Sequence, residues 1–140
     1  MNKIEQKSVF NMFHDGTIVQ FFESTKKISI EIEIEYLAEL INQNFKYFIC
    51  ELINCKEIYF KFWEDNNNTV NDLEILKKYE LDILEAEEID DKIVVKCLSN
   101  INTGGNLYIK TESIKVYDQD KQEISFSKLA EVSHQYWNKI

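Results

Sequence analysis

The clearest pattern in the chain is a strict alternation of apolar and polar residues over positions 28–35, which read Ile-Ser-Ile-Glu-Ile-Glu-Ile-Glu. Successive side chains of a strand point to opposite faces, so the four isoleucines share one face and the serine and three glutamates share the other. A strand with one dry face and one wet face is typical of an antiparallel sheet. We therefore expect a strand over residues 27–36, paired in a hairpin with a strand over residues 17–22.

Further strands, separated by polar turns, are predicted over residues 45–53, 57–63, 79–89, 92–98 and 107–117. The first of these is apolar on both faces, which predicts a central strand joined to the second by a hairpin turn at 54–56. The last strand and the strand from residue 79 each change the face on which their apolar residues lie, and a bulge or bend would restore one buried face. Residues 71–78 fit a short helix or a loop, and 64–69 and 99–106 are predicted loops.

Each end of the chain predicts a helix. Apolar residues recur at helical spacing over residues 3–13, and Asp15-Gly16 ends that segment. Near the other end, Ser125 or Ser127 caps a helix whose apolar residues lie near one face. Together these elements predict a single α+β domain over residues 1–140: a meandering antiparallel sheet of about seven strands that can curl toward a barrel, with an N-terminal and a C-terminal helix.

Charge and cysteine content narrow the function classes. The formal net charge is -9, and all 16 basic residues are lysines. Arginine has the planar guanidinium that binds phosphates and guanine edges through two hydrogen bonds, and nucleic-acid binding needs a cationic face. Because the chain is acidic and lacks arginine, we expect no nucleic-acid partner. An odd number of cysteines, Cys50, Cys55 and Cys97, favours free thiols in a reducing compartment over a disulfide framework.

The sequence contains no motif for metal binding, cofactor binding, membrane insertion or secretion. The cysteines lack a second pair or a histidine at zinc-ligand spacing, no EF-hand loop is present, and Gly104-Gly105 matches no phosphate-binding fingerprint. The first residues lack the apolar core of a signal peptide, and no apolar run approaches the length of a membrane span. We therefore expect a cytoplasmic protein with no metal, no cofactor and no membrane partner.

Catalysis by an activated nucleophile would need one of the two histidines, His14 and His134, in a pocket. His14 lies where a helix is predicted to end and His134 lies within the C-terminal helix, so a structural role is the simpler interpretation of both. We assign no catalytic residue, and an enzyme of unrecognised type stays open as an alternative.

Two acidic rows are the candidate partner-binding features. One follows the wet face of the alternating strand, and the other places seven acids within residues 80–91 without a lysine. Neighbouring like charges are mildly destabilising, so these rows either keep the surface soluble or dock a basic protein. Large aromatic residues at polar-side strand positions are typical interface anchors. The candidate residues are Glu31, Glu33, Glu35, Tyr59, Trp63, Glu85, Glu87 and Glu88.

Residues 13–18 (Phe-His-Asp-Gly-Thr-Ile) and the closing pair Tyr136-Trp137 are similar to patches of small uncharacterised bacterial proteins. Some of those resemble immunity proteins of polymorphic or contact-dependent toxin systems. The resemblance implies an acidic, single-domain, non-enzymatic cytoplasmic protein that neutralises a toxin by occluding it. The leading hypothesis is thus a non-catalytic binding protein, of the immunity type, that docks a basic protein through an acidic face. The alternative is a small-molecule-binding protein that uses the interior of the curled sheet.

Overall fold

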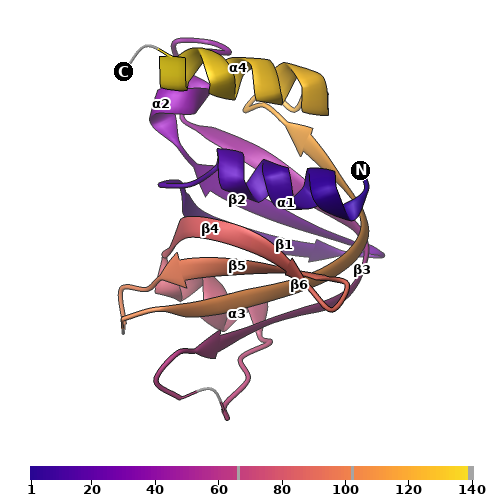
Figure 1. Cartoon of the computed structure of the whole chain (residues 1–140), viewed down its shortest axis with the longest axis vertical. Coiled ribbons are helices and arrows are strands. Elements are labelled where there is room, and N and C mark those ends of the chain that lie inside the picture. Colours follow the sequence, from indigo (N-terminus) through magenta and orange to yellow (C-terminus); the bar gives the residue numbers. More distant parts are fainter. Residues whose placement is uncertain (66, 102, 139–140) are drawn as a thin grey trace.

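The computed structural model describes residues 1–65, 67–101 and 103–138 (Figure 1). The predicted loops at 64–69 and 99–106 each include a residue, 66 or 102, that lies outside the described residues. The elements are α1 (Lys3–Met12), β1 (Thr17–Ser24), β2 (Lys27–Glu33), α2 (Glu35–Ala38), β3 (Tyr47–Phe62), α3 (Leu73–Leu76), the 3₁₀ turn η1 (Lys77–Tyr79), β4 (Leu81–Ile89), β5 (Lys92–Leu98), β6 (Gly105–Tyr117), β7 (Glu123–Ile124) and α4 (Phe126–Asn138).

Within the described residues, seven strands form one antiparallel sheet in the order β3-β2-β1-β4-β5-β6-β7, and β3 also pairs with β6. The backbone hydrogen bonds therefore run in a closed ring through six strands, and the short strand β7 pairs with β6 beside that ring. The predicted α+β fold, an antiparallel sheet with a helix near each end, is confirmed.

Strand β2 shows the two faces that the alternation predicts. Its three isoleucines are buried, whereas Ser29, Glu31 and Glu33 lie on the outer face of the ring. The strand ends at Glu33, however, because Ile34 is the N-cap of the short helix α2, which begins at Glu35, and the Ile34 side chain is buried. The prediction of a strand to residue 36 was therefore too long, and Glu35 stands on a helix.

Strand β3 is the largest correction. The predicted hairpin at 54–56 is wrong, because Tyr47–Phe62 is a single strand of 16 residues. Asn54 has a left-handed φ of 52°, and the register against β6 shifts between Cys55 and Glu57, so this segment is a bulge in the strand and not a turn. Burial on both faces is wrong too, because the outward-facing side chains of its first half are only half-buried. The seventh strand of the sheet is instead β7.

Other local predictions are confirmed. The register of β4 against β5 shifts between Ile83 and Glu85, where the sequence pattern changes face. In β6 the buried side chains are at odd-numbered positions up to Thr111 and at even-numbered positions from Ile114. The short helix α3 and turn η1 occupy the segment that fitted a helix or a loop. The Ser125 hydroxyl oxygen accepts a hydrogen bond from the Lys128 N–H and caps α4.

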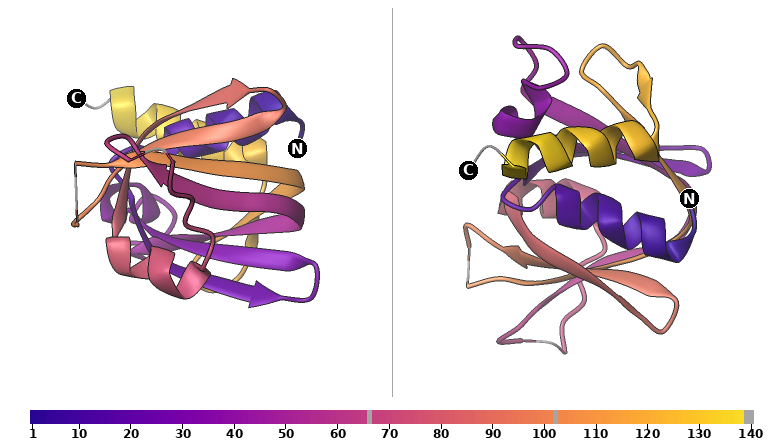
Figure 2. Two further views of the ribbon diagram at one scale, coloured as in Figure 1. Left: turned by 90° about the horizontal axis from the view of Figure 1, so that it is seen from below. Right: turned by 45° about the horizontal axis from the view of Figure 1, so that its top comes forward.

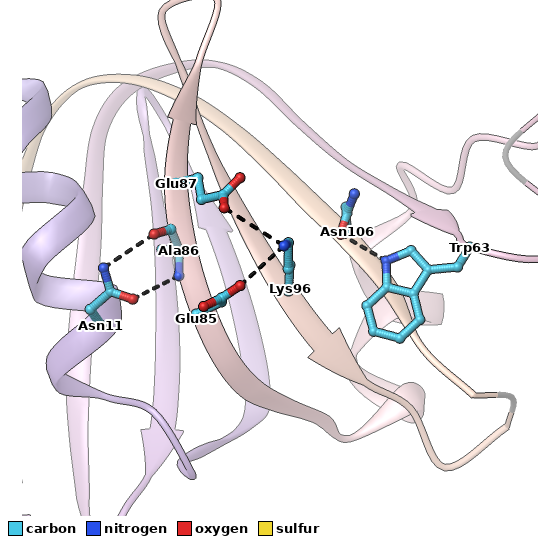
Figure 3. A network of polar contacts seen from close by, with 7 residues as sticks. All are labelled: Asn11, Trp63, Glu85, Ala86, Glu87, Lys96 and Asn106. Atoms are coloured by element: carbon cyan, nitrogen blue, oxygen red, sulfur yellow. Dashed lines mark hydrogen bonds and ion pairs between the residues drawn. The ribbon is translucent and has the colours of Figure 1, made fainter.

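Helix α1 covers a place where two strands separate. Strand β1 pairs with β4 through only two residues, and α1 lies along β4 beyond that point (Figure 2). Val9, Phe10 and Phe13 are fully buried in the hydrophobic core. On the same side, the Asn11 side chain replaces a strand partner: its Nδ2 donates to the Ala86 carbonyl (3.1 Å), and the Ala86 N–H donates to its Oδ1 (2.8 Å) (Figure 3).

Candidate functional site

An open groove lies on the outer face of the ring, over β1, β2, β3 and the end of β6. Its volume is about 570 Å³, which falls within the range of small-ligand sites. We call it the β2–β3 groove. The residues that line it are Phe22, Ser29, Glu31, Tyr47, Ile49, Glu51, Tyr117 and Lys121.

Strand register arranges these side chains in two cross-strand rows. In the first row, Ile49 lies between Glu31 and Tyr117. In the second, a serine of β2 lies between Phe22 and Glu51. The side chains in each row share the outer face because paired residues of an antiparallel sheet point the same way. The two glutamates are diagonal neighbours on adjacent strands, a relation that separates residues by about 7–8 Å.

The acids of the groove are incompletely balanced by the protein's own lysines. Glu51 pairs with the Nζ of Lys27 at 3.6 Å, and its side chain is only 16% exposed. Among the ion pairs formed by the described residues, none involves Glu31. Burial, and then the charge of Glu33, raise the pKa of Glu31. A cation placed in the groove would therefore favour the ionised form of Glu31.

Tyr117 contributes an aromatic wall beside these acids. Its pKa is raised by burial first and then by the negative charges of Glu51 and Glu123. Across the groove, the Phe22 ring is 57% exposed, which is unusual for a phenylalanine on a strand. The groove thus combines carboxylates with accessible aromatic rings, which is the chemistry that attracts cationic side chains.

A second outer surface crosses β3, β6, β5 and β4. The rings of Tyr59 and Tyr108 stack with their centroids 4.8 Å apart. Lys92 Nζ donates to the Tyr59 hydroxyl at 3.0 Å and pairs with Glu57 at 3.3 Å, and these two contacts raise the pKa of Lys92. We call this surface the Tyr59 face. Its residues are Glu57, Tyr59, Trp63, Glu85, Glu87, Lys92, Lys96, Asn106 and Tyr108.

Each acid of the Tyr59 face has a lysine within ion-pair distance, although two lysines serve three acids. Lys96 reaches Glu85 at 3.0 Å and Glu87 at 3.7 Å (Figure 3). Beside them, the Trp63 Nε1–H donates to Asn106 Oδ1 at 2.9 Å, which fixes the indole ring. Two acids of the predicted row over residues 80–91, Glu85 and Glu87, are therefore ion-paired with a lysine of the next strand.

The structure divides the predicted partner-binding residues among five places. Glu31 lines the β2–β3 groove, and Glu33 follows it at the exposed end of β2. Glu35 lies on α2, away from that strand. Tyr59 and Trp63 lie with Glu85 and Glu87 on the Tyr59 face, whereas Glu88 has the strand parity of the inward-facing Ala86.

Sequence reasoning missed most of the groove. Phe22, Tyr47, Ile49, Glu51 and Tyr117 were not among the candidate residues. A signal was present, because residues 45–53 are apolar on both faces although β3 has its outward side chains only half-buried. Apolar residues on the outer side of a strand mark either a second core or an exposed binding surface.

The two histidines line neither groove nor face. The His14 ring stacks on Trp137 with centroids 4.6 Å apart, and its Nδ1 lies 2.7 Å from the Asn11 carbonyl oxygen. His134 is exposed on α4, where its Nε2 lies 2.9 Å from the amide nitrogen of Asn138. The predicted structural role at the end of α1 agrees with the position of His14.

The predicted free thiols are confirmed. Cys50 and Cys97 are buried and Cys55 is half-buried. Burial raises the pKa of all three thiols, to about 12 for Cys50 and about 11 for Cys55. No group of three or more metal-ligating side chains occurs within residues 1–65, 67–101 and 103–138. None of the helices that the structure describes is long and apolar enough to cross a membrane.

Comparison with known proteins adds no relative. The chain matches no family model, and no curated protein or solved structure shows significant similarity to it. Function is therefore inferred from the geometry and charge of the two outer surfaces.

Proposed function

We propose that this protein is a non-catalytic binding protein whose β2–β3 groove docks a basic segment of a protein partner. The observation that carries the proposal is Glu31, a partly buried carboxylate with a raised pKa, a like-charged neighbour and no ion pair among the described residues. A partner's cationic side chain would supply the missing charge.

The whole-molecule charge supports this partner class. A net charge of -9 attracts cationic proteins over distances of about one Debye length and raises their association rate. The exposed ring of Phe22 and the half-buried rings of Tyr47 and Tyr117 would bury apolar area around the charged contact. Tyrosine is enriched among the residues that dominate binding energies at protein interfaces.

We also propose a cellular compartment and a biological role for the protein. Three free thiols support a reducing, cytoplasmic compartment, and the absence of arginine from the sequence argues against nucleic acid as partner. Because parts of the sequence resemble immunity proteins, the partner that we favour is a basic toxin domain. Binding of its basic segment in the groove would occlude the toxin.

Peptide display tests the proposal even while the partner is unidentified. A library of random peptides is selected on the wild-type protein, and the selected peptides are then measured against a Glu31→Lys, Glu51→Lys variant. We expect enrichment of basic residues, weaker binding to the variant, and slower association at higher salt. Glu131→Lys on α4, an exposed position away from the groove, is the control and should reduce binding far less. Selected peptides without basic residues, or equal binding to both variants, would show that the proposal is wrong.

A small-molecule binder is the second candidate, and the volume of the groove favours it. The groove's volume of about 570 Å³ lies within the range of small-ligand sites. The inward-facing side chains of the ring form the hydrophobic core, so the outer groove replaces the sheet interior as the candidate site. Selection of neutral, aromatic peptides that bind both lysine variants would favour this candidate.

A further inference from the structure

We infer that Ser29 is the specificity-determining position of the β2–β3 groove. Its small side chain leaves room for the aliphatic part of a partner's lysine or arginine side chain, whose charged end then lies beside Glu31. This assignment rests on the proposed function and deepens it, because it places the partner's cationic side chain within the groove.

Strand register sets Ser29 between two larger side chains. It is the smallest residue that lines the groove, and on the outer face it is paired with Phe22 of β1 on one side and Glu51 of β3 on the other. Strands β1 and β3 are two strand spacings apart, about 9.5 Å, and strand side chains stand roughly perpendicular to the sheet. The phenylalanine and the glutamate therefore form two walls, and the serine forms a low floor between them.

The space over this floor fits a methylene chain. Carbon atoms in contact with a wall on each side need a gap of about 7–8 Å in total. Lysine and arginine bury their methylene groups along apolar surface while the charged end stays in polar surroundings. Phe22 offers such a surface, because it is one of the exposed large hydrophobic residues of the chain.

Glu31 is the acid that receives the charge. It lies two residues from Ser29 on β2, so both side chains point to the outer face. Glu51 already pairs with Lys27, which does not line the groove, so Glu51 acts as a wall. Glu31 has no ion pair among the described residues and is free to bind a partner's cation.

Filling the floor with aliphatic side chains tests this role of Ser29. A capped hexalysine peptide is the probe, and backbone amide shifts of the isotope-labelled full chain report binding at Ile49 and Tyr117. Ser29→Ala keeps the space and should bind within about twofold of the wild type. Ser29→Val should bind less tightly, and Ser29→Ile about tenfold less tightly, because the cationic side chain then loses the burial of about two methylene groups.

Ser24→Ile is the matched control, because Ser24 lies on the same face of β1 but does not line the groove. It should bind within about twofold of the wild type. Isoleucine and valine favour strands, and an unchanged spectrum outside the groove checks that each variant is folded.

Three outcomes would overturn the role of Ser29. If Ser29→Ile binds the peptide in the groove as tightly as Ser24→Ile does, the inference is wrong and the proposed function stands. An equal loss of binding in Ser29→Ala and Ser29→Ile would show that the hydroxyl group matters and the space does not. If the wild type shows no shifts in the groove with the peptide, both the proposed function and this inference are wrong.

Discussion

The contact between α1 and β4 gives a sharp stability prediction. Replacing Asn11 with alanine removes both hydrogen bonds to Ala86, which is only 5% exposed. The Ala86 N–H and carbonyl would then lack partners on the side of β4 that faces away from β5, where β1 no longer pairs with it. Because the pair is reciprocal, one truncation leaves both a donor and an acceptor unsatisfied.

The size of the effect follows from three contributions. Each of the two Ala86 groups left unsatisfied costs about 1–3 kcal/mol, a cost that already includes its lost hydrogen bond. Alanine offsets about 0.6 kcal/mol of this loss because it is the better helix former in α1. We expect the Asn11→Ala variant to lose about 2–5 kcal/mol of its free energy of unfolding, and the urea midpoint to fall by roughly 1–2.5 M.

Urea unfolding followed by circular dichroism measures this loss. Gln135→Ala on the exposed side of α4 is the matched control and should change the midpoint little. Asn11→Asp gives a second check, because a protonated carboxyl offers one donor and one acceptor as the amide does, whereas the ionised form offers only acceptors. Its loss of stability should shrink as the pH falls through the carboxyl range. A midpoint for Asn11→Ala equal to that of the control would refute this role of Asn11.

The core, the thiols and the tyrosines give three further predictions. Ile32→Ala should cost about 2–5 kcal/mol in urea unfolding because its side chain is fully buried, whereas Glu33→Gln should be near neutral. In the native protein a thiol reagent should modify Cys55 slowly and the other two cysteines only on unfolding, as mass spectrometry would show. Burial raises the pKa of Tyr36 from 10.0 to about 12, so its stabilising contribution is lost between those pH values, and Tyr36→Phe should flatten the alkaline fall in urea midpoint.

Local sequence patterns predicted most strands because each has one buried face. The alternation in β2 gave the correct faces from Ile28 to Glu33, and the changes of face in β4 and β6 indicated real irregularities. The hairpin within β3 could not be distinguished from a bulge, since Asn54-Cys55-Lys56 is polar enough for either. Which one forms depends on β6, a strand more than 50 residues away that pairs with both halves of β3.

The candidate site depended even more on pairings distant in sequence. Seven acids without a lysine between residues 80 and 91 predicted an acidic surface, but Lys96 of the next strand forms ion pairs with two of them, Glu85 and Glu87. The groove joins residues of four strands, and only Glu31 among its lining residues was predicted. Sequence identifies which residues face outward, whereas strand register decides which of them become neighbours.

The central claim is that a basic segment of another protein occupies the β2–β3 groove. Site-specific photo-crosslinking tests it most directly, with a benzoylphenylalanine in place of Phe22 and, as control, in place of Gln135 on α4. The cross-linked peptide is then sequenced by mass spectrometry from cells that produce the protein. We expect an adduct that forms only from position 22, whose peptide contains lysine or arginine, and that Glu31→Lys abolishes. An absence of any adduct specific to position 22, or an adduct to an acidic or neutral segment, would contradict it.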